Sequence, residues 1–323
     1  MINIAICFDD NFVMPAGVLL TSICISNNKN ELTFYIISDS LSDENKRNLK
    51  LIVEKYKKNI NFIDISLENL KDFPINLSCF TLATYYRILL SEVLPADLHK
   101  IIYLDCDMLV VDDLLEFFNT DITSFSTAIT PDMFYDDERI TNRLFYSVSE
   151  HYYNAGMLLI NLDYWRNNKI TEKTIDFIIN HKELCLAHDQ DAINAVLHGT
   201  IYTAPFRYNV QLDFFKKKTK MIFSDISKID DAREASKHPC VIHFTGPSKP
   251  WKFQSYNPFE SLWYYFQDKT IWSKLPKEHE FHGYKLFKWK IKHFLELTHL
   301  RHKRINEYDD VSAVINKIIA DLD

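Results

Sequence analysis

The sequence predicts an α/β fold with a central sheet, and two observations support that prediction. Short apolar runs with strand character alternate along the chain with segments of helical length, which is typical of helices that cover a largely parallel sheet. The chain has 323 residues, of which 47% are hydrophobic and 25% are charged. It is therefore globular, with enough apolar surface for one large core or two modest ones.

The expected elements follow this alternation in order. In the first third of the chain, strands are expected at 2–8, 33–38, 60–65 and 100–104, because each is a short, mainly apolar run. Helices are expected between and after them at 15–25, 42–56 and 83–93. Further strands are expected at 124–130, 155–160, 200–204 and 240–244, and further helices at 171–180 and 189–197.

Glycine and cysteine usage excludes several classes of site. Five glycines in 323 residues is roughly 1.5%, against a usual figure of about 7%, and none has the spacing of a dinucleotide-binding fingerprint or a P-loop. The six cysteines form no C-x-x-C pair for zinc, and we expect them to be reduced core residues of a cytosolic protein. We also expect no signal peptide and no membrane-spanning segment.

The charge distribution along the chain is uneven. Residues 285–304 carry seven Lys and Arg against one acidic residue, Glu296, which gives a local charge of +6. Because the net charge of the whole chain is −7, the rest of the chain carries −13. Such an acidic body is not expected to bind nucleic acid. If it binds an anionic ligand, a metal ion or a few well-placed cations must reverse the local field.

The C-terminal segment has a different composition from the rest of the chain. It is basic and aromatic after 272–276, which places a boundary between a domain at 1–272 and an extension at 273–323. At helical pitch, one narrow polar stripe carries Lys285, Lys288, Lys292, Glu296 and His299, with mainly apolar residues around it. Two interpretations stay open: a helix docked on its own domain, or a helix that lies on an anionic membrane surface through 284–304.

The strongest local signal for chemistry is Asp105-Cys106-Asp107 at the end of the predicted strand 100–104. Ligands of open α/β sheets gather at the carboxyl ends of strands, and two carboxylates one residue apart can reach one divalent cation. Such oxygen ligands suit Mg²⁺ or Mn²⁺. The second D-x-D, Asp189-Gln190-Asp191, begins a predicted helix, where acidic residues also serve as caps.

A second candidate segment lies near the end of the expected sheet. His243 ends the apolar strand 240–244 and is followed by a turn at Gly246. Lys249 then lies between two prolines and Trp251. A stiff backbone lowers the entropic cost of presenting one cation, so this lysine is a candidate phosphate ligand.

Taken together and in order, these segments resemble the retaining glycosyltransferases of family 8. The matching segments are 8–11, 84–87, 103–107, 153–161, 189–191 and 243–251. The resemblance covers roughly the first 270 residues and leaves the basic extension outside. It implies a single GT-A domain at 1–272, Rossmann-like, with a mixed central sheet flanked by helices, followed by the helical extension 273–323.

The resemblance also implies a role for individual residues. Asp105, Asp107 and His243 resemble the ligands of Mn²⁺, or Mg²⁺ in its place. The nucleotide and its diphosphate would be held by Cys7, Asp9, Asn11, the backbone of Cys106, Gly246 and Lys249. The donor sugar would be surrounded by Arg87, Asn154, Asp189 and Gln190, with Asp132 on the acceptor side. The catalytic set implied is therefore Gln190, Asp189 and Asp132.

The implied activity is transfer of glucose or galactose from a UDP-sugar to a glycan acceptor, which a lipid could carry, in synthesis of lipopolysaccharide or another surface polysaccharide. The family has an amide at the position of Gln190, so we expect retention by front-face attack rather than through a carboxylate nucleophile. The expected location is the cytoplasm, peripheral to the inner face of the membrane. Two alternatives are a sugar-nucleotide pyrophosphorylase and a catalytically idle scaffold that binds a nucleotide sugar or is recruited to a membrane.

Overall fold

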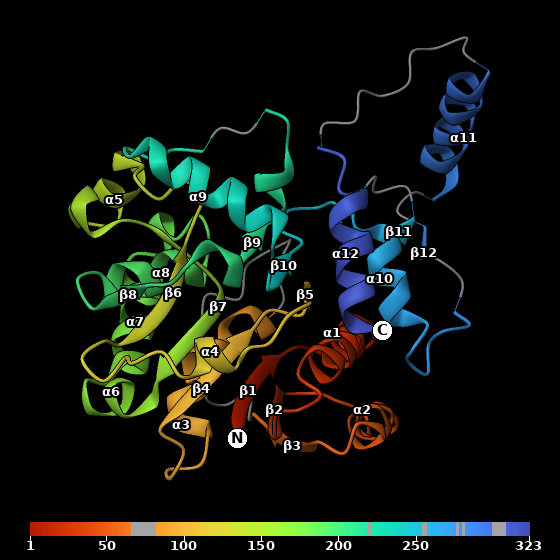
Figure 1. Cartoon of the computed structure of the whole chain (residues 1–323). Coiled ribbons are helices and arrows are strands. Elements are labelled where there is room, and N and C mark those ends of the chain that lie inside the picture. Colours follow the sequence, from red (N-terminus) through yellow and green to blue (C-terminus); the bar gives the residue numbers. More distant parts are fainter. Residues whose placement is uncertain (66–81, 219–220, 254–256, 276–277, 280–281, 299–307) are drawn as a thin grey trace.

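The computed structural model describes the chain except residues 66–81, 219–220, 254–256, 276–277, 280–281 and 299–307. Cys79, the end of the basic stretch and His299 therefore lie outside the described residues. In the described parts, helices surround a central sheet (Figure 1). Among these parts, no helix combines the length and the apolar character needed to cross a membrane.

The central sheet has seven strands in the order β3-β2-β1-β4-β7-β6-β8. Their bounds are β1 Ile2–Cys7, β2 Leu32–Ser38, β3 Asn59–Asp64, β4 Lys100–Leu104, β6 Thr127–Pro131, β7 Tyr153–Asn161 and β8 Ile201–Thr203. Six strands run in one direction, whereas β7 is antiparallel to both of its neighbours, β4 and β6. The largely parallel sheet expected from the alternation is thus a mixed one. The apolar pattern of β7 could not reveal this, because a strand buried on both faces has the same composition in either direction.

Helices cover both faces of the sheet. Their bounds are α1 Val13–Ser26, α2 Asp43–Lys55, α3 Leu90–Val93, α4 Leu115–Phe118, α5 Glu138–Arg143, α6 Leu162–Asn167, α7 Ile170–Asn180, α8 Asp189–Leu197, α9 Ile226–Lys237, α10 Glu260–Gln267, α11 Gly283–Leu297 and α12 Ser312–Leu322. The helix expected at 83–93 is a 3₁₀ segment, η3 Leu82–Leu89, that continues into the short α3.

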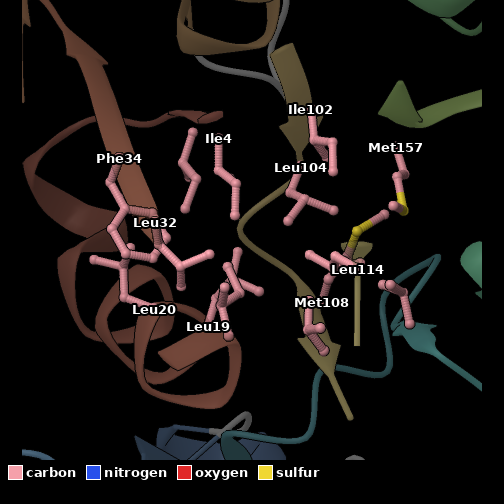
Figure 2. Close-up of a cluster of buried hydrophobic side chains, with 14 of the residues drawn as sticks. Ile4, Leu19, Leu20, Leu32, Phe34, Ile102, Leu104, Met108, Leu114 and Met157 are labelled. Carbon is pink, nitrogen blue, oxygen red and sulfur yellow. The ribbon is translucent and has the colours of Figure 1, made fainter. Parts of the chain in front are cut away.

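Alternate residues of the strands supply two separate cores. Ile4 and Ile6 of β1 pack with α1 and α2 on one face, whereas Ala5 and Cys7 pack with the residues of α6, α7 and α8 on the other. Figure 2 shows part of the first core, in which Leu19 and Leu20 of α1 lie over Ile4 and Leu32. Packing on both faces holds the strands in place, and with them the residues of the candidate site that follow the strand ends.

A second, three-stranded sheet connects distant parts of the chain. Its order is β5-β10-β9, with bounds Met108–Val110, Val241–His243 and Val210–Gln211. The register pairs His243 with Met108. Because β5 directly follows Asp107, this pairing brings His243 beside the carboxylates that follow β4. A further pair, β11 Lys252–Phe253 and β12 Glu278–His279, lies toward the C-terminus.

The two C-terminal helices differ in how they contact the body. Val311, Ile315 and Ile318, in and next to α12, are buried in a third core together with Trp263 of α10. By contrast, α11 projects from the body (Figure 1) and exposes large apolar side chains, including those of Phe287 and Phe294. The boundary at 272 stays a prediction, and α12, which belongs to the proposed extension, packs against the preceding residues.

Candidate active site

The candidate site is a cavity of about 830 Å³ at the carboxyl ends of β1 and β4. Its lining contains most of the residues that the sequence selected: Cys7, Asp9, Arg87, Asp105, Cys106, Asp107, Asn154, Gln190, His243, Gly246 and Lys249. Asp132 and Asp189 are buried and are not part of that lining, but both bond to residues that are. Asn11 is exposed on the turn after β1 and is also not part of the lining.

Asp105, Asp107 and His243 come together at the floor of this cavity. Each offers one ligand atom, and these atoms lie within 4.8 Å of one another. His243 Nε2 is 3.3 Å from Asp107 Oδ1 and 4.0 Å from Asp105 Oδ2. Two carboxylate oxygens and one imidazole nitrogen suit Mn²⁺ or Mg²⁺ better than a soft metal. The residues present therefore fit a divalent cation.

The other oxygen of each aspartate is occupied by a protein group. Asp105 Oδ1 accepts a hydrogen bond from the Tyr103 hydroxyl at 2.5 Å and lies 3.0 Å from an Arg87 nitrogen. Asp107 Oδ2 accepts one from Lys249 Nζ at 2.5 Å. Burial alone would raise the pKa of Asp107, but Lys249 and His243 outweigh it and hold that pKa far below its ordinary value. Both aspartates thus keep one oxygen directed toward His243.

Arg87 connects the segment that contains Asp105 and Asp107 to the start of α8. Its Nε lies 2.7 Å from Asp189 Oδ2, and its NH1 donates to the Ala155 carbonyl at 2.6 Å. Its guanidinium also lies over the Tyr103 ring, 4.7 Å from the centroid. Burial raises the pKa of Asp189 to about 6, even though Arg87 acts to lower it. Arg87 is thus a buried cation that two carboxylates share.

Gln190 lines the cavity and lies beside Asp132. Its Nε2 donates to the Tyr152 hydroxyl at 3.0 Å and to Asp132 Oδ2 at 3.4 Å, and its Oε1 accepts from the Ala155 N–H at 3.1 Å. Burial raises the pKa of Asp132. Each polar atom of the Gln190 amide therefore has a partner, which holds the side chain in one orientation.

The second D-x-D segment serves two different purposes. Asp189 joins the site through Arg87, whereas Asp191 pairs with Arg143 at 2.9 Å and accepts a bond from the Ala187 N–H at 2.7 Å. Asp191 is also bonded to the Tyr152 hydroxyl at 2.7 Å. Asp191 thus connects the first turn of α8 to the loop before it, whereas the N-cap position of α8 is occupied by His188 and no side chain makes a capping hydrogen bond there.

The wall nearest β1 is formed by two buried cysteines and a turn. Burial raises the pKa of the Cys7 and Cys106 thiols, so both stay protonated and unreactive. Asp9 Oδ1 accepts the Asn11 N–H at 3.0 Å, which closes the turn after β1, and Phe12 lines the cavity just beyond this turn. In this structure Asn11 therefore contributes to the turn rather than to the cavity wall.

Comparison with known proteins identifies the family of this chain. Residues 3–255 match the family described as Glycosyl transferase family 8. The chain belongs to that family. The matched residues include every residue of the cavity described above and end before α10.

Several relatives of this family 8 chain have curated names. It is 28% identical over 280 residues to General stress protein A of Bacillus subtilis, covering 85% of this chain and 96% of that one. It is 26% identical over 253 residues to the lipopolysaccharide 1,2-glucosyltransferase of Escherichia coli K12, covering 77% and 72%. The lipopolysaccharide 1,3-galactosyltransferase of Salmonella typhimurium is 24% identical over 273 residues, covering 83% and 77%.

Solved structures confirm the predicted fold. The galactosyltransferase LgtC, crystallised with donor and acceptor sugar analogs, superposes with a TM-score of 0.75 at 24% identity, over 85% of this chain and 98% of that one. The family 8 protein thus has an LgtC-like GT-A fold with a mixed central sheet flanked by helices.

Sequence reasoning missed four residues that shape this site: Tyr103, Tyr152, Gly156 and Asn209. Asn209 has no nearby motif, and a lone Asn after an aromatic residue resembles an ordinary turn. Of the four, Gly156 could most readily have been selected from the sequence. Few glycines occur in the chain, and this one lies inside a buried strand. A Cβ there would lie 2.3 Å from His243 Cε1, so only glycine leaves room for the imidazole.

Proposed function

We propose that this chain is a metal-dependent retaining hexosyltransferase that moves glucose or galactose from a UDP-sugar to a glycan acceptor. One observation carries the proposal: Asp105, Asp107 and His243 converge within 4.8 Å at the floor of a cavity that also contains Lys249. This arrangement is what an acidic protein needs in order to bind a diphosphate. The names of the lipopolysaccharide glucosyltransferase and galactosyltransferase relatives support a hexose donor and a surface-glycan acceptor.

The metal ion in this proposal is Mn²⁺ or Mg²⁺, held by Asp105, Asp107 and His243. When bound, it supplies Lewis-acid stabilisation of the charge that develops on the leaving diphosphate. Lys249 adds a second positive charge beside Asp107, and Gly246, with a φ of +75°, lets the backbone turn close to the same place. The nucleotide would lie along Cys7, Asp9 and the backbone of Cys106, with Asn11 at the exposed end.

The donor sugar would lie between Arg87, Asn154, Asp189 and Gln190. No carboxylate among the described residues of this wall is free to act as a nucleophile in this structure: Asp189 is paired with Arg87, and Asp132 accepts bonds from Asn154 and Gln190. This pairing supports front-face attack, in which the acceptor hydroxyl enters on the side that the diphosphate leaves and a diphosphate oxygen takes its proton. The Gln190 carbonyl oxygen would stabilise the positive charge on the sugar.

The proposal includes a peripheral location on the cytoplasmic face of a membrane. The support is α11, in which Tyr284, Phe287, Ile291 and Phe294 expose between 45% and 76% of their surface next to several lysines. A basic helix with an exposed apolar side has the chemistry of a segment that binds anionic lipid. Such a location would bring the cavity near a lipid-carried glycan.

The experiment that tests the activity is UDP release from UDP-glucose and UDP-galactose in the presence of Mn²⁺. We expect release with one of the two sugars, loss of release with excess chelator, and at least about a hundredfold loss in Asp107→Asn, since a group that stabilises developing charge is worth this much. The anomeric configuration of a transferred sugar, read by NMR, should be retained. Absence of release with every UDP-sugar would replace this proposal with the idle scaffold.

A further inference from the structure

A continuous chain of side-chain hydrogen bonds connects His243 to Gln190 beneath the cavity. His243 Nδ1 lies 3.0 Å from Asn209 Oδ1, and Asn209 Nδ2 lies 2.9 Å from Asn154 Oδ1. Asn154 Nδ2 then donates to Asp132 Oδ2 at 3.0 Å, and Gln190 Nε2 donates to that oxygen at 3.4 Å. Asn209, the second member of this chain of hydrogen bonds, is fully buried. His243, which binds the metal in the proposed function, and Gln190, which contacts the sugar, are therefore connected by direct hydrogen bonds between side chains.

Backbone groups of β7 fix the direction of the donors and acceptors in this chain. The Gly156 N–H lies 3.1 Å from one atom of the Asn154 amide. A backbone N–H only donates, so that atom must be the amide oxygen. The other atom of the same amide is then the nitrogen, and it faces the acceptor Asp132. The Ala155 N–H fixes Gln190 in the same way, at 3.1 Å from Oε1.

This direction determines which ring nitrogen of His243 carries a hydrogen. Because Asn154 presents its oxygen, Asn209 must present its nitrogen to Asn154, and so its oxygen faces His243. An oxygen there accepts a hydrogen bond, so His243 Nδ1 must be the N–H. In the neutral ring, Nε2 then has its lone pair directed toward Asp105 and Asp107. The tautomer that a metal requires thus follows from one backbone amide of β7, the Gly156 N–H.

We propose that Asn209 is a positioning residue that fixes His243 for the metal and, with the other half of the same amide, fixes Asn154 for the donor sugar. The inference rests on the proposed function, in which His243 binds the metal and Asn154 contacts the sugar. Partners that hold the second nitrogen of a metal-bound histidine typically change metal affinity by about 10- to 100-fold when they are removed. Removal of the Asn209 side chain would therefore weaken metal binding through His243 and sugar binding through Asn154.

The two halves of the Asn209 amide can be tested separately by substitution. Asn209→Asp keeps an oxygen acceptor for His243 Nδ1 but removes the donor to Asn154. Asn209→Leu has a similar volume and removes both. Asn27→Leu is a matched control, because Asn27 is also buried and its Oδ1 accepts the Leu114 N–H, in the helical layer away from the cavity lining.

The first measurement is the ¹⁵N NMR spectrum of the histidine rings in the full-length, metal-free protein at pH 8.5, with His243→Gln for assignment. We expect the wild type to show a hydrogen on Nδ1 of His243. A wild-type ring whose only hydrogen is on Nε2 would overturn the inference, whatever the variants do. This readout needs neither metal nor activity, so it is independent of the proposed function and of how well Asn209→Leu folds.

The second measurement is Mn²⁺ binding, followed by the EPR signal of free Mn²⁺ without any nucleotide sugar. We expect at least about tenfold weaker binding in Asn209→Leu and wild-type affinity or better in Asn209→Asp and Asn27→Leu. Asn209→Asp should still raise the KM for the UDP-sugar, because Asn154 loses a donor. Unchanged Mn²⁺ affinity in a folded Asn209→Leu would overturn the inference. Absence of Mn²⁺ binding in the wild type would instead contradict the proposed metal site.

Discussion

Arg87 and Asp189 form a buried ion pair, with 2.7 Å between Nε and Oδ2 and almost no exposure of either side chain. The same guanidinium lies 3.0 Å from Asp105. Removal of the one cation would therefore leave two carboxylates without compensation in a low-dielectric environment. A buried charge that loses its partner is far more costly than the pair itself is stabilising.

We predict that Arg87→Met lowers the free energy of unfolding by about 3 to 5 kcal/mol. Urea denaturation at neutral pH measures it. Arg139→Met is the control, because Arg139 pairs with Asp137 while its own side chain is 82% exposed, and an exposed ion pair contributes little to stability. Equal effects of the two substitutions would contradict the burial argument.

The raised pKa of Asp189, about 6, predicts a pH-dependent difference between the wild type and Asp189→Asn. The folded pKa lies above the ordinary value of 3.8, so the folded state binds this proton more tightly than the unfolded chain does. The contribution to stability is complete below pH 3.8 and is lost as the pH rises through 6. From pH 4 to pH 7, the free energy of unfolding of the wild type should therefore fall relative to the variant, by up to about 3 kcal/mol. A difference that does not vary with pH would show that Asp189 does not titrate in this range.

Gly156→Ala should impair metal binding as well as stability. The added Cβ would lie 2.3 Å from His243 Cε1 and 2.8 Å from Nδ1, so the imidazole must move away from Asn209. Gly17→Ala produces a similar clash, 2.2 Å from a Trp272 ring atom, but in the packing between α1 and the segment after α10. We expect both to lose about 1 to 3 kcal/mol of unfolding free energy and only Gly156→Ala to weaken Mn²⁺ binding. Loss of Mn²⁺ binding in both would mean that general instability is the cause.

Lys249→Met should weaken binding of UDP, measured by calorimetry in the presence of Mg²⁺, by at least about tenfold, because charge-assisted hydrogen bonds contribute about 1.5 to 3 kcal/mol. Lys249→Arg keeps the charge and should retain part of the affinity. Lys252→Met, three residues along and absent from the cavity lining, is the matched control. If all three variants bind UDP like the wild type, Lys249 is only a partner of Asp107.

The exposed apolar side of α11 predicts binding to anionic vesicles. In the full-length chain, a combined Phe287→Ser and Phe294→Ser variant should lose most of its cosedimentation with vesicles that contain phosphatidylserine, whereas UDP release in solution should be unchanged. Point variants are preferable to truncation, because α12 lies further along the chain and contributes Ile315 and Ile318 to a buried core. Equal sedimentation of variant and wild type would rule out these two residues as the membrane contact.

Much of the site could be predicted because its residues lie in segments with recognisable order. Asp105 and Asp107 follow a strand whose bounds, Lys100–Leu104, agree with the prediction, and the helix that begins at Asp189 also has the predicted bounds. His243 was selected because it ends a buried strand, and the structure confirms that position. Family resemblance then related these separate segments to one ligand set, which local patterns alone could not do.

The rest depends on contacts between segments that are distant in the sequence. The reversed direction of β7 is decided by its pairing with β4 and β6, not by its own residues. Asn209 acquires its place only when β9 and β10 pair side by side. The helix expected at 83–93 is mainly 3₁₀, a difference of hydrogen-bond spacing that the apolar pattern does not specify.

The reversal of β7 has a consequence for how this enzyme family can diversify. Since β7 enters the sheet where β4 leaves it, the first residues of β7 lie beside the end of β4: Asn154 lines the cavity, and the Asp105 N–H bonds to the Gly156 carbonyl at 2.8 Å. A strand, rather than a loop, thus supplies this side of the cavity, although its pairing with β6 is irregular at these residues. Substitutions in this part of β7 would also disturb Asp105 and His243, which contact it, so a change of donor sugar is easier to obtain in the surrounding loops.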